Sequence, residues 1–346
     1  MLRLPRAWVD RRAADLLRDI MPVAALAVLV ALFAVIGWWL DRGRFFSLDN
    51  AALVIANSSY VTVGALGMML IIAAGGIDLS AGAVLGLCTA VLAYGLRRFG
   101  PLEENAPLLM PLIFVAAAVL AGAACGAVNG TLISRFRLAP FIVTLGAMTV
   151  YLGLALILAQ EKTVTPPPGT VPSWLKLFVA QSHFSLWNGF LPTIPLGIAV
   201  ELALAGLLAL VMRKTVVGRH VLAIGANETA ARLCGIRVVS LRIAVYTLGG
   251  ALFGLAGVYQ FALVKNYTPN TGAGRELDII AAVVIGGGSL KGGRASVIGT
   301  LVGSLLMAVI RSGCTQLSVP NPYQQIIIGS IIIAAVLFDR AAGRGE

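Results

Sequence analysis

The sequence has very little charge for its length. Of its 346 residues 12% are charged and only 15 are acidic, whereas 59% are hydrophobic and the mean hydropathy is +0.92. A soluble domain cannot bury so large a share of apolar side chains, so the composition excludes a soluble globular protein. It predicts an all-α protein that crosses a membrane several times.

Histidine and cysteine are also scarce. His183 and His220 lie too far apart to indicate a zinc site, and the four cysteines include no Cys-x-x-Cys pair. Three of the cysteines lie in or beside apolar runs, where they are expected to act as small hydrophobic side chains. We therefore expect no metal and no cofactor bound by this chain.

Signatures of catalysis are missing as well. The sequence has no Gly-x4-Gly-Lys-Ser/Thr loop for ATP, since the lysine in the glycine-rich run 286–293 is not followed by Ser or Thr. A Gly-x-Ser-x-Gly elbow and a His-Glu-x-x-His pair are absent too. These absences argue against an enzyme.

Long apolar runs, by contrast, fill the sequence, and a helix needs about 20 such residues to cross a bilayer. The first run is too long for a signal-peptide core and has no Ala-x-Ala exit, so we expect it to stay uncleaved. The eighth run is short and ends in three glycines, which indicates a broken or half-crossing helix and leaves nine or eleven crossings possible. The ten predicted spans are 21–40, 51–74, 80–96, 107–133, 140–160, 191–212, 243–264, 277–288, 296–312 and 323–338.

The net charge of +11 does not indicate nucleic-acid binding, because no basic run is interleaved with aromatic residues. We expect the basic residues to set the orientation of the spans in the membrane instead. If the N-terminus is inside, 17 of the 26 Lys and Arg residues lie in inner segments, which favours two cytoplasmic termini. The expected organisation is a cytoplasmic tail (1–20), one transmembrane domain (21–339) and a C-terminal tail (340–346). Within the domain, 161–190 is an external loop and 213–242 a cytoplasmic loop.

Glycine is abundant, with 39 residues, and many lie inside the predicted spans. Small-xxx-small pairs such as Gly122/Gly126 and Gly250/Gly254 let helices approach closely in lipid, so we expect a compact bundle. There is also a weak internal repeat. The segment 72–80 resembles 284–293, and both join two spans on the inner side, where transporters often place working parts.

The cytoplasmic loop carries a short predicted helix. Asn227 is a good N-cap, Glu228 lies in the first turn where the helix dipole favours an anion, and Gly235 is a good C′ residue. A capped helix between two spans, flanked by cations, is typical of a docking element for a cytoplasmic partner.

Asp78 is the only acidic residue between Asp49 and Glu103. An acid between two spans is costly unless it is paired, capping or near water, so Asp78 is either a pathway or gating residue or an N-cap of the third span, with Ser80 as the alternative cap. The two interpretations are compatible.

Several other polar residues lie in or beside spans. Asn57, Asn129 and Gln260 either contact a hydroxylated solute or hold helices together, and the second is favoured. Glu201 faces the bundle, pairs with a cation or marks a proton path. Glu276 and Asp278 open the eighth span, where they complement the helix dipole, form an external gate or contact a delivery protein.

Three segments together resemble the permease subunits of bacterial ATP-binding-cassette sugar importers of the ribose, xylose, arabinose and galactofuranose type. They are Gly75-Gly-Ile-Asp-Leu-Ser-Ala-Gly82, the stretch from Val217 to Ile236, and Glu276 to Gly293. With the span pattern, they cover nearly all of residues 20–339. The branched-chain amino-acid permeases share the fold and are the nearest confusion.

The resemblance implies a type II importer-like bundle of about ten helices with broken helices, located in the bacterial inner membrane. It implies a second permease subunit, two cytoplasmic ATPases that hold ATP and Mg, and a periplasmic sugar-binding protein. The loop 213–242 would couple to an ATPase, through Arg219, Gly225, Asn227, Glu228, Ala231, Arg232 and Gly235. Candidates for the pathway or its gates are Asn57, Gly75, Gly76, Asp78, Ser80, Asn129, Glu276 and Asp278.

Two other classes remain open. An ion-coupled secondary transporter would need several ionisable residues within the membrane, and Glu201 is the main residue in its favour. A structural or receptor membrane protein would not need so many glycine-broken helices. The sequence therefore favours a membrane permease of a sugar importer, powered by partner ATPases.

Overall fold

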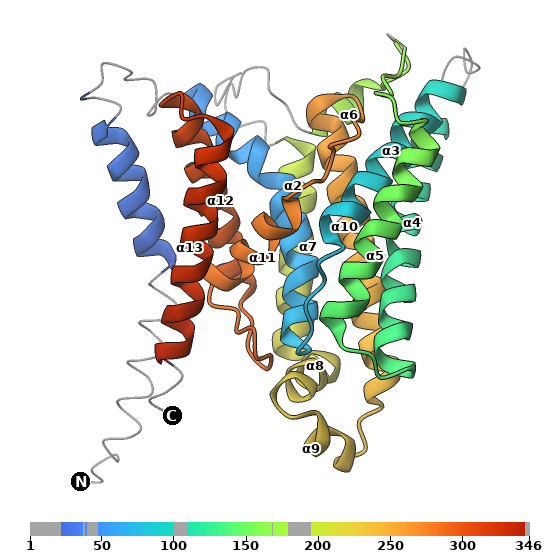
Figure 1. Cartoon of the computed structure of the whole chain (residues 1–346), viewed down its shortest axis with the longest axis vertical. Helices are drawn as coiled ribbons and strands as arrows, with labels where there is room; N and C mark the ends of the chain where they lie inside the picture. The colour runs from blue at the N-terminus through green and yellow to red at the C-terminus, as the bar shows by residue number, and fades with distance from the viewer. Residues whose placement is uncertain are drawn as a thin grey trace.

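A computed structural model describes residues 22–36, 39, 48–99, 109–167, 169–178 and 195–342. Its helices stand side by side in one bundle, which confirms the predicted all-α membrane fold (Figure 1). The helices are α2 (Leu48–Ala73), α3 (Ala81–Phe99), α4 (Leu109–Arg135), α5 (Pro140–Ala159), α6 (Ser173–Phe178), α7 (Leu196–Lys214), α8 (Val216–Ala226), α9 (Glu228–Leu233), α10 (Val238–Val264), α11 (Arg275–Ile285), α12 (Val297–Gln316) and α13 (Asn321–Ala342).

Seven described helices are long and apolar enough to cross a membrane, namely α2, α3, α4, α5, α7, α10 and α12. The predicted count of ten is therefore not confirmed. The first predicted span is represented by a helix over Pro22–Ile36, and α13 covers the tenth. The tail 1–20 and residues 343–346 lie outside the described part of the chain, as does most of the second half of the external loop.

Helix α11 is short, as the three glycines indicated. Its 11 residues rise about 17 Å, roughly half the thickness of the hydrocarbon core. It ends at Ile285 rather than at residue 288, because Gly286 caps it and Gly287 turns away with a φ of 87°. Residues 286–296 lead from α11 to α12 without helix, so the eighth predicted span is a short helix that breaks at its glycines.

The second break lies between α2 and α3. The chain leaves α2 at Ala73 and runs back into the bundle as an irregular segment over 74–80, and α3 starts inside the bundle (Figure 1). There the first turns of α3 and α11 meet, since a Cβ on Gly82 would overlap the carbonyl oxygen of Gly272 and the carboxylate of Glu276. Two helices thus begin against each other in the protein interior.

Glycines hold α4 against α10. A Cβ on Gly122 would overlap the carbonyl oxygen of Gly250, a Cβ on Gly250 would overlap that of Gly122, and one on Gly126 would overlap that of Tyr246. In lipid, the association of helices depends on this kind of close backbone contact, because the hydrophobic effect does not drive helices together there. The predicted role of these small residues in packing is confirmed.

The polar loop 213–242 is more helical than expected. Helix α7 continues to Lys214, and α8 fills 216–226, where no separate helix was expected. Thr215 explains the new start, because its Oγ1 accepts a hydrogen bond from the N–H of Gly218 and caps α8. Helices α8 and α9 form one end of the molecule, and α13 runs toward the same end (Figure 1).

We expect Gly126→Ala to destabilise the bundle. The added methyl meets backbone, which cannot rotate away, and such overpacking typically costs about 1–3 kcal/mol. The thermal midpoint of the purified protein in detergent should fall. Gly153→Ala is the matched control, because a Cβ there has no described neighbour within 4 Å. Equal midpoints for the two variants would contradict this account of the α4–α10 contact.

Candidate functional site

Helix α9 has the predicted caps. The Asn227 side chain accepts a hydrogen bond from the N–H of Ala230 at 3.0 Å. Gly235 has a φ of 80°, and the N–H of Ile236 bonds back to the carbonyl of Ala231 at 3.1 Å, which closes the C-terminus in a Schellman arrangement. Both ends of this six-residue helix are satisfied, so it can hold its shape outside the membrane.

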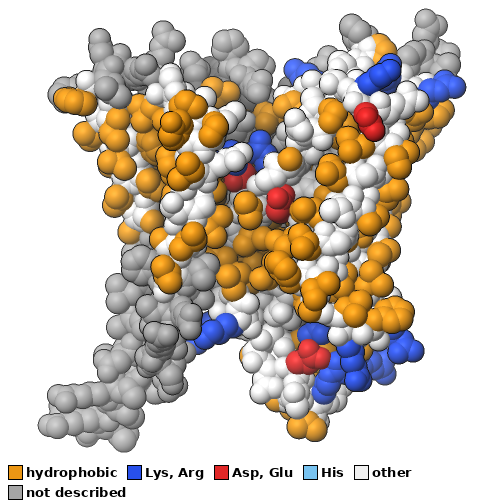
Figure 2. Space-filling view, viewed as in Figure 1, with side chains coloured by type: hydrophobic (Ala, Val, Ile, Leu, Met, Phe, Trp, Pro, Cys, Tyr) orange, Lys and Arg blue, Asp and Glu red, His pale blue; other side chains and the backbone are white. Residues whose placement is uncertain are grey.

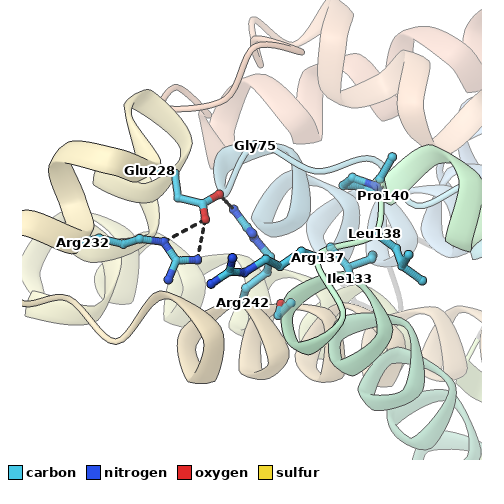
Figure 3. A pocket seen from close by; sticks show the side chains of 10 residues that line it. Gly75, Ile133, Arg137, Leu138, Pro140, Glu228, Arg232 and Arg242 are labelled. Atoms are coloured by element: carbon cyan, nitrogen blue, oxygen red, sulfur yellow. Dashed lines mark hydrogen bonds and ion pairs between the residues drawn. The ribbon is translucent and has the colours of Figure 1, made fainter.

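Glu228 does more than complement the helix dipole, because it binds two arginines (Figure 3). Its Oε1 accepts from Arg232 at 2.6 Å, one turn along α9, and its Oε2 accepts from Arg242 of α10, also at 2.6 Å. Burial alone would raise the pKa of Glu228, but the hydrogen bonds and charges of Arg242 and Arg232 outweigh it and lower the pKa. Arg242 thereby ties α9 to the membrane-spanning helix α10.

Gly225 of α8 joins three segments. A Cβ there would overlap the carbonyl oxygen of Ala73, at the end of α2, and would crowd the backbone nitrogen of Gly293. That nitrogen donates a hydrogen bond to the Ala73 carbonyl at 3.0 Å. Gly75 and Gly292 lie beside Gly225 with φ values of 79° and 86°. The two segments of the predicted repeat therefore meet at α8, in what we call the glycine junction (Ala73, Gly75, Gly225, Gly292, Gly293).

The remaining coupling candidates differ in their environments. Ala231 is buried with Ile224 and Val238 and anchors α9 to its neighbours. Arg219, on α8, is exposed and is not among the residues that bind Glu228. The predicted set is thus partly structural, with Gly225 and Ala231 placing α8 and α9.

Asp78, Ser80 and Asn129 are brought together in the protein interior, and all three are buried. Asp78 Oδ1 accepts from the N–H of Ser80 at 2.8 Å and from its Oγ at 2.6 Å. Asn129 Nδ2 of α4 donates to Asp78 Oδ2 at 3.2 Å and to Ser80 Oγ at 2.9 Å. Tyr151 of α5 completes the network by donating to Asn129 Oδ1 at 2.9 Å.

This network decides between the two predicted caps of α3. Ser80 precedes the helix, and its carbonyl accepts the N–H of Val84. Asp78 instead bonds two residues ahead in an Asx turn and fixes the irregular segment 74–80. Gly76 lies in the same segment against Tyr246, because a Cβ there would overlap its hydroxyl. Asn129 holds helices together, as favoured from the sequence.

A second group lines a cavity of about 350 Å³ between α2, α11, α12 and α13. Asp278 lies at its wall, and its side chain is only 1% exposed. Arg311 of α12 donates to both of its carboxylate oxygens, at 2.7 and 2.6 Å, and Arg275 donates to Oδ2 at 3.2 Å. Figure 2 shows basic and acidic side chains together in the middle of a face that is otherwise hydrophobic.

The rest of the cavity wall is rich in amides. Asn57 lies in it, exposed to the cavity rather than bonded between helices, contrary to the packing role favoured for it. The Arg275 guanidinium stacks over the ring of Tyr60 at 5.2 Å. The other polar side chains in the wall are Asn50, Ser312, Thr315, Gln316, Asn321 and Gln324. Hydroxyls, amides and guanidinium groups are what a polyhydroxylated solute needs.

Two carboxylates stay outside the cavity. Glu276 lies next to Gly82 at the start of α11, and Glu201 of α7 is buried beside the hydroxyls of Ser59 and Thr62. Three partners were not predicted from the sequence: Arg242 pairs with Glu228, Arg311 pairs with Asp278, and Tyr151 donates to Asn129. Of these, only the partner role of Arg311 could have been inferred from the sequence, because an arginine inside a membrane span requires an acidic partner.

Residues 50–336 match the family described as "Branched-chain amino acid transport system / permease component". The chain belongs to this family. It is 35% identical to the ribose import permease protein RbsC of Escherichia coli K12 over 91% of each chain. It is 31% identical to the fructose import permease protein FrcC of Rhizobium meliloti, over 92% of this chain and 85% of the relative. Identity to the L-arabinose ABC transporter permease protein AraH of Azospirillum brasilense is 33%, over 90% of this chain and 86% of that one. No solved structure gives a significant match.

We expect Asp78→Asn to impair this permease through the interior network. In the variant, an NH₂ group replaces the carboxylate oxygen that accepts a hydrogen bond from Asn129 Nδ2, so two donors face each other. Losing a hydrogen bond to a charged group costs about 1.5–3 kcal/mol. Thermal midpoint and transport rate should both fall. In an Asn129→Ala background the same change should cost less, because the opposing donor is gone. Native stability and transport in Asp78→Asn would leave Asp78 as a local turn residue only.

Proposed function

We propose that this chain is the membrane subunit of an ATP-binding-cassette importer that translocates a monosaccharide. The observation that carries the proposal is the likeness, over about nine tenths of the chain, to permeases named for ribose, fructose and arabinose import. The amide-lined cavity with Asp278 and Asn57 supports a hydroxylated substrate. The sugar would be delivered by a periplasmic binding protein.

The energy would come from separate ATPase subunits that bind ATP and Mg. In this proposal α9 seats on an ATPase, and closure of the ATPase dimer displaces α8 and α9. The glycine junction would pass that displacement to residues 286–296 and to α11, which carries Asp278. A second permease subunit, identical or related, would complete the pore.

The proposed location is the bacterial inner membrane, with both termini in the cytoplasm. Support comes from the basic side chains gathered around α8 and α9 at one end of the molecule (Figure 2), since cytoplasmic loops are rich in Lys and Arg. Helix α13 ends on the side of α8 and α9 (Figure 1). The direction of α13 supports a C-terminus on the same side as the proposed coupling loop.

The importer proposal predicts ATP-dependent sugar uptake. Proteoliposomes that contain the permease, its ATPase and its binding protein should accumulate a labelled pentose or hexose only when ATP is supplied on the α9 side. Leucine uptake in the same assay would favour the branched-chain amino-acid alternative. Accumulation driven by an ion gradient without ATP would favour a secondary transporter.

Reversing the charge of Glu228 should uncouple the ATPase and spare the membrane fold. In Glu228→Arg three arginines would face one another where Arg232 and Arg242 now share a carboxylate. The opposed helix dipole adds about 0.3–1 kcal/mol, enough to loosen a helix of six residues but not a bundle. Co-elution with the ATPase and sugar-stimulated hydrolysis should drop.

Glu161→Arg is the matched control, because it reverses an exposed charge just beyond α5, at the opposite end of that helix from α9. It should leave co-elution with the ATPase unchanged. If Glu228→Arg also retains normal stoichiometry and normal stimulated hydrolysis, α9 is not the coupling element.

The proposed sidedness predicts opposite signals from two reporter fusions. A reporter after residue 340 should remain cytoplasmic, whereas one inserted within 161–190 should be external. The same signal from both positions would exclude the proposed topology.

A further inference from the structure

A second cavity, of about 660 Å³, lies between α9 and the turn that joins α4 to α5. It is open to the surface at the end of the bundle that carries α8 and α9. We call it the basic pocket and define it by Ser134, Arg137, Leu138, Glu228, Arg232 and Arg242. Its charges are unequal, since three guanidinium groups and only one carboxylate line it.

The imbalance centres on Arg137. Glu228 already binds Arg232 and Arg242 with both of its oxygens. Arg137 extends toward the same space (Figure 3), yet within the described ranges it has no hydrogen-bond or ion-pair partner. The pocket therefore carries two positive charges in excess, at a place where a guanidinium fork is free to bind an anion.

Ser134 is the second, independent sign of a ligand. Its side chain is 4% exposed and lines the pocket, and its hydroxyl has no hydrogen-bond partner among the described residues. Buried hydroxyls are nearly always paired. An acceptor oxygen inside the pocket would satisfy this hydroxyl and Arg137 together, which a phosphate group can do.

The surroundings indicate where that phosphate comes from. The α4–α5 turn and the start of α5 expose Phe136 (64%), Leu138 (48%) and Phe141 (56%) beside the cationic wall. Helices α4 and α5 are membrane-spanning and meet at this turn, so the pocket lies where lipid headgroups begin. Cationic pockets between helices at this depth accommodate anionic headgroups, while apolar side chains beside them meet acyl chains.

We propose that the basic pocket binds the phosphate of an anionic phospholipid, which fastens α9 to the α4–α5 turn. Arg137 and Ser134 donate hydrogen bonds to the phosphate oxygens, and Arg232 and Arg242 contribute charge while they remain bound to Glu228. The acyl chains lie along the exposed apolar side chains of α5. Anionic lipid thus sets the position of α9 in the absence of any solute or nucleotide.

The test measures lipid binding by the full-length permease in detergent, with neither sugar nor ATP present. Native mass spectrometry should show phosphatidylglycerol retained by the wild type and phosphatidylcholine retained far less. Arg137→Gln should weaken phosphatidylglycerol retention about tenfold, as expected for one charged hydrogen bond. Ser134→Ala should weaken it less. Arg213→Gln is the matched control, because Arg213 is exposed at the same end but lies outside the pocket wall, and it should bind like the wild type.

Three results would overturn the proposal. Equal retention by Arg137→Gln and Arg213→Gln would reduce the effect to general surface charge. Displacement of the lipid by millimolar inorganic phosphate would make the pocket a site for a free anion. Unchanged lipid retention with loss of ATPase co-elution in Arg137→Gln would assign the arginine to the ATPase interface. Since the assay involves no transport, its outcome is independent of whether the permease carries a sugar.

Discussion

The close backbone contact at Gly225 is the constraint on which the rest of the structure depends. Chain breaks inside a membrane protein leave unpaired N–H and C=O groups, and these must find partners within the protein. Here the carbonyl of Ala73, at the end of α2, accepts the N–H of Gly293 in the break that follows α11, while Gly225 of α8 packs over both. Any larger side chain at Gly225 would separate these segments. One contact thus joins the two breaks and fixes the loop 213–242 to them.

Three carboxylates show how differently burial can be compensated. Asp278 is fully buried and is neutralised by Arg311 and Arg275. Glu228 is partly exposed and shares its charge with two arginines at the surface. Asp78 has no cation among its described hydrogen-bond partners and depends on donated hydrogen bonds alone, from Ser80 and Asn129. Burying a charge is costly unless such partners are present, so each acid requires its own local architecture.

Features with local causes could be predicted from the sequence. Asn227 and Gly235 bound α9 because caps depend on residues within one helical turn, and the triple glycine ends α11 for the same reason. Helix α8 was missed because its signal, the Thr215 cap, lies inside a loop that is polar overall.

Pairings between distant residues could not be predicted. Asp278 and Arg311 are 33 positions apart, and Asn129 lies 51 positions from Asp78. Nothing in a single sequence says which cation approaches which acid, because that depends on how the helices pack. The packing role favoured for Asn57 was wrong for the same reason, whereas its role as a pathway candidate stays a prediction. Its helix, α2, is mostly buried, but this position faces the cavity.

The arrangement of these contacts also determines which parts can move. Helix α10 is held to α4 by interlocking glycines along its length and to α9 by Arg242, so one side of the loop 213–242 is fixed. The other side ends at the glycine junction, beyond which lie an irregular segment and the half-length helix α11.

A displacement of α9 would hardly move α4 relative to α10, because the packing between these two helices leaves no room for even a methyl group. The displacement would therefore fall on residues 286–296 and α11. Because α11 carries Asp278, a displacement of α11 would also shift the cavity wall through the ion pair between Asp278 and Arg311. The same two breaks that complicate the hydrogen bonding of the bundle thus give it a place to bend.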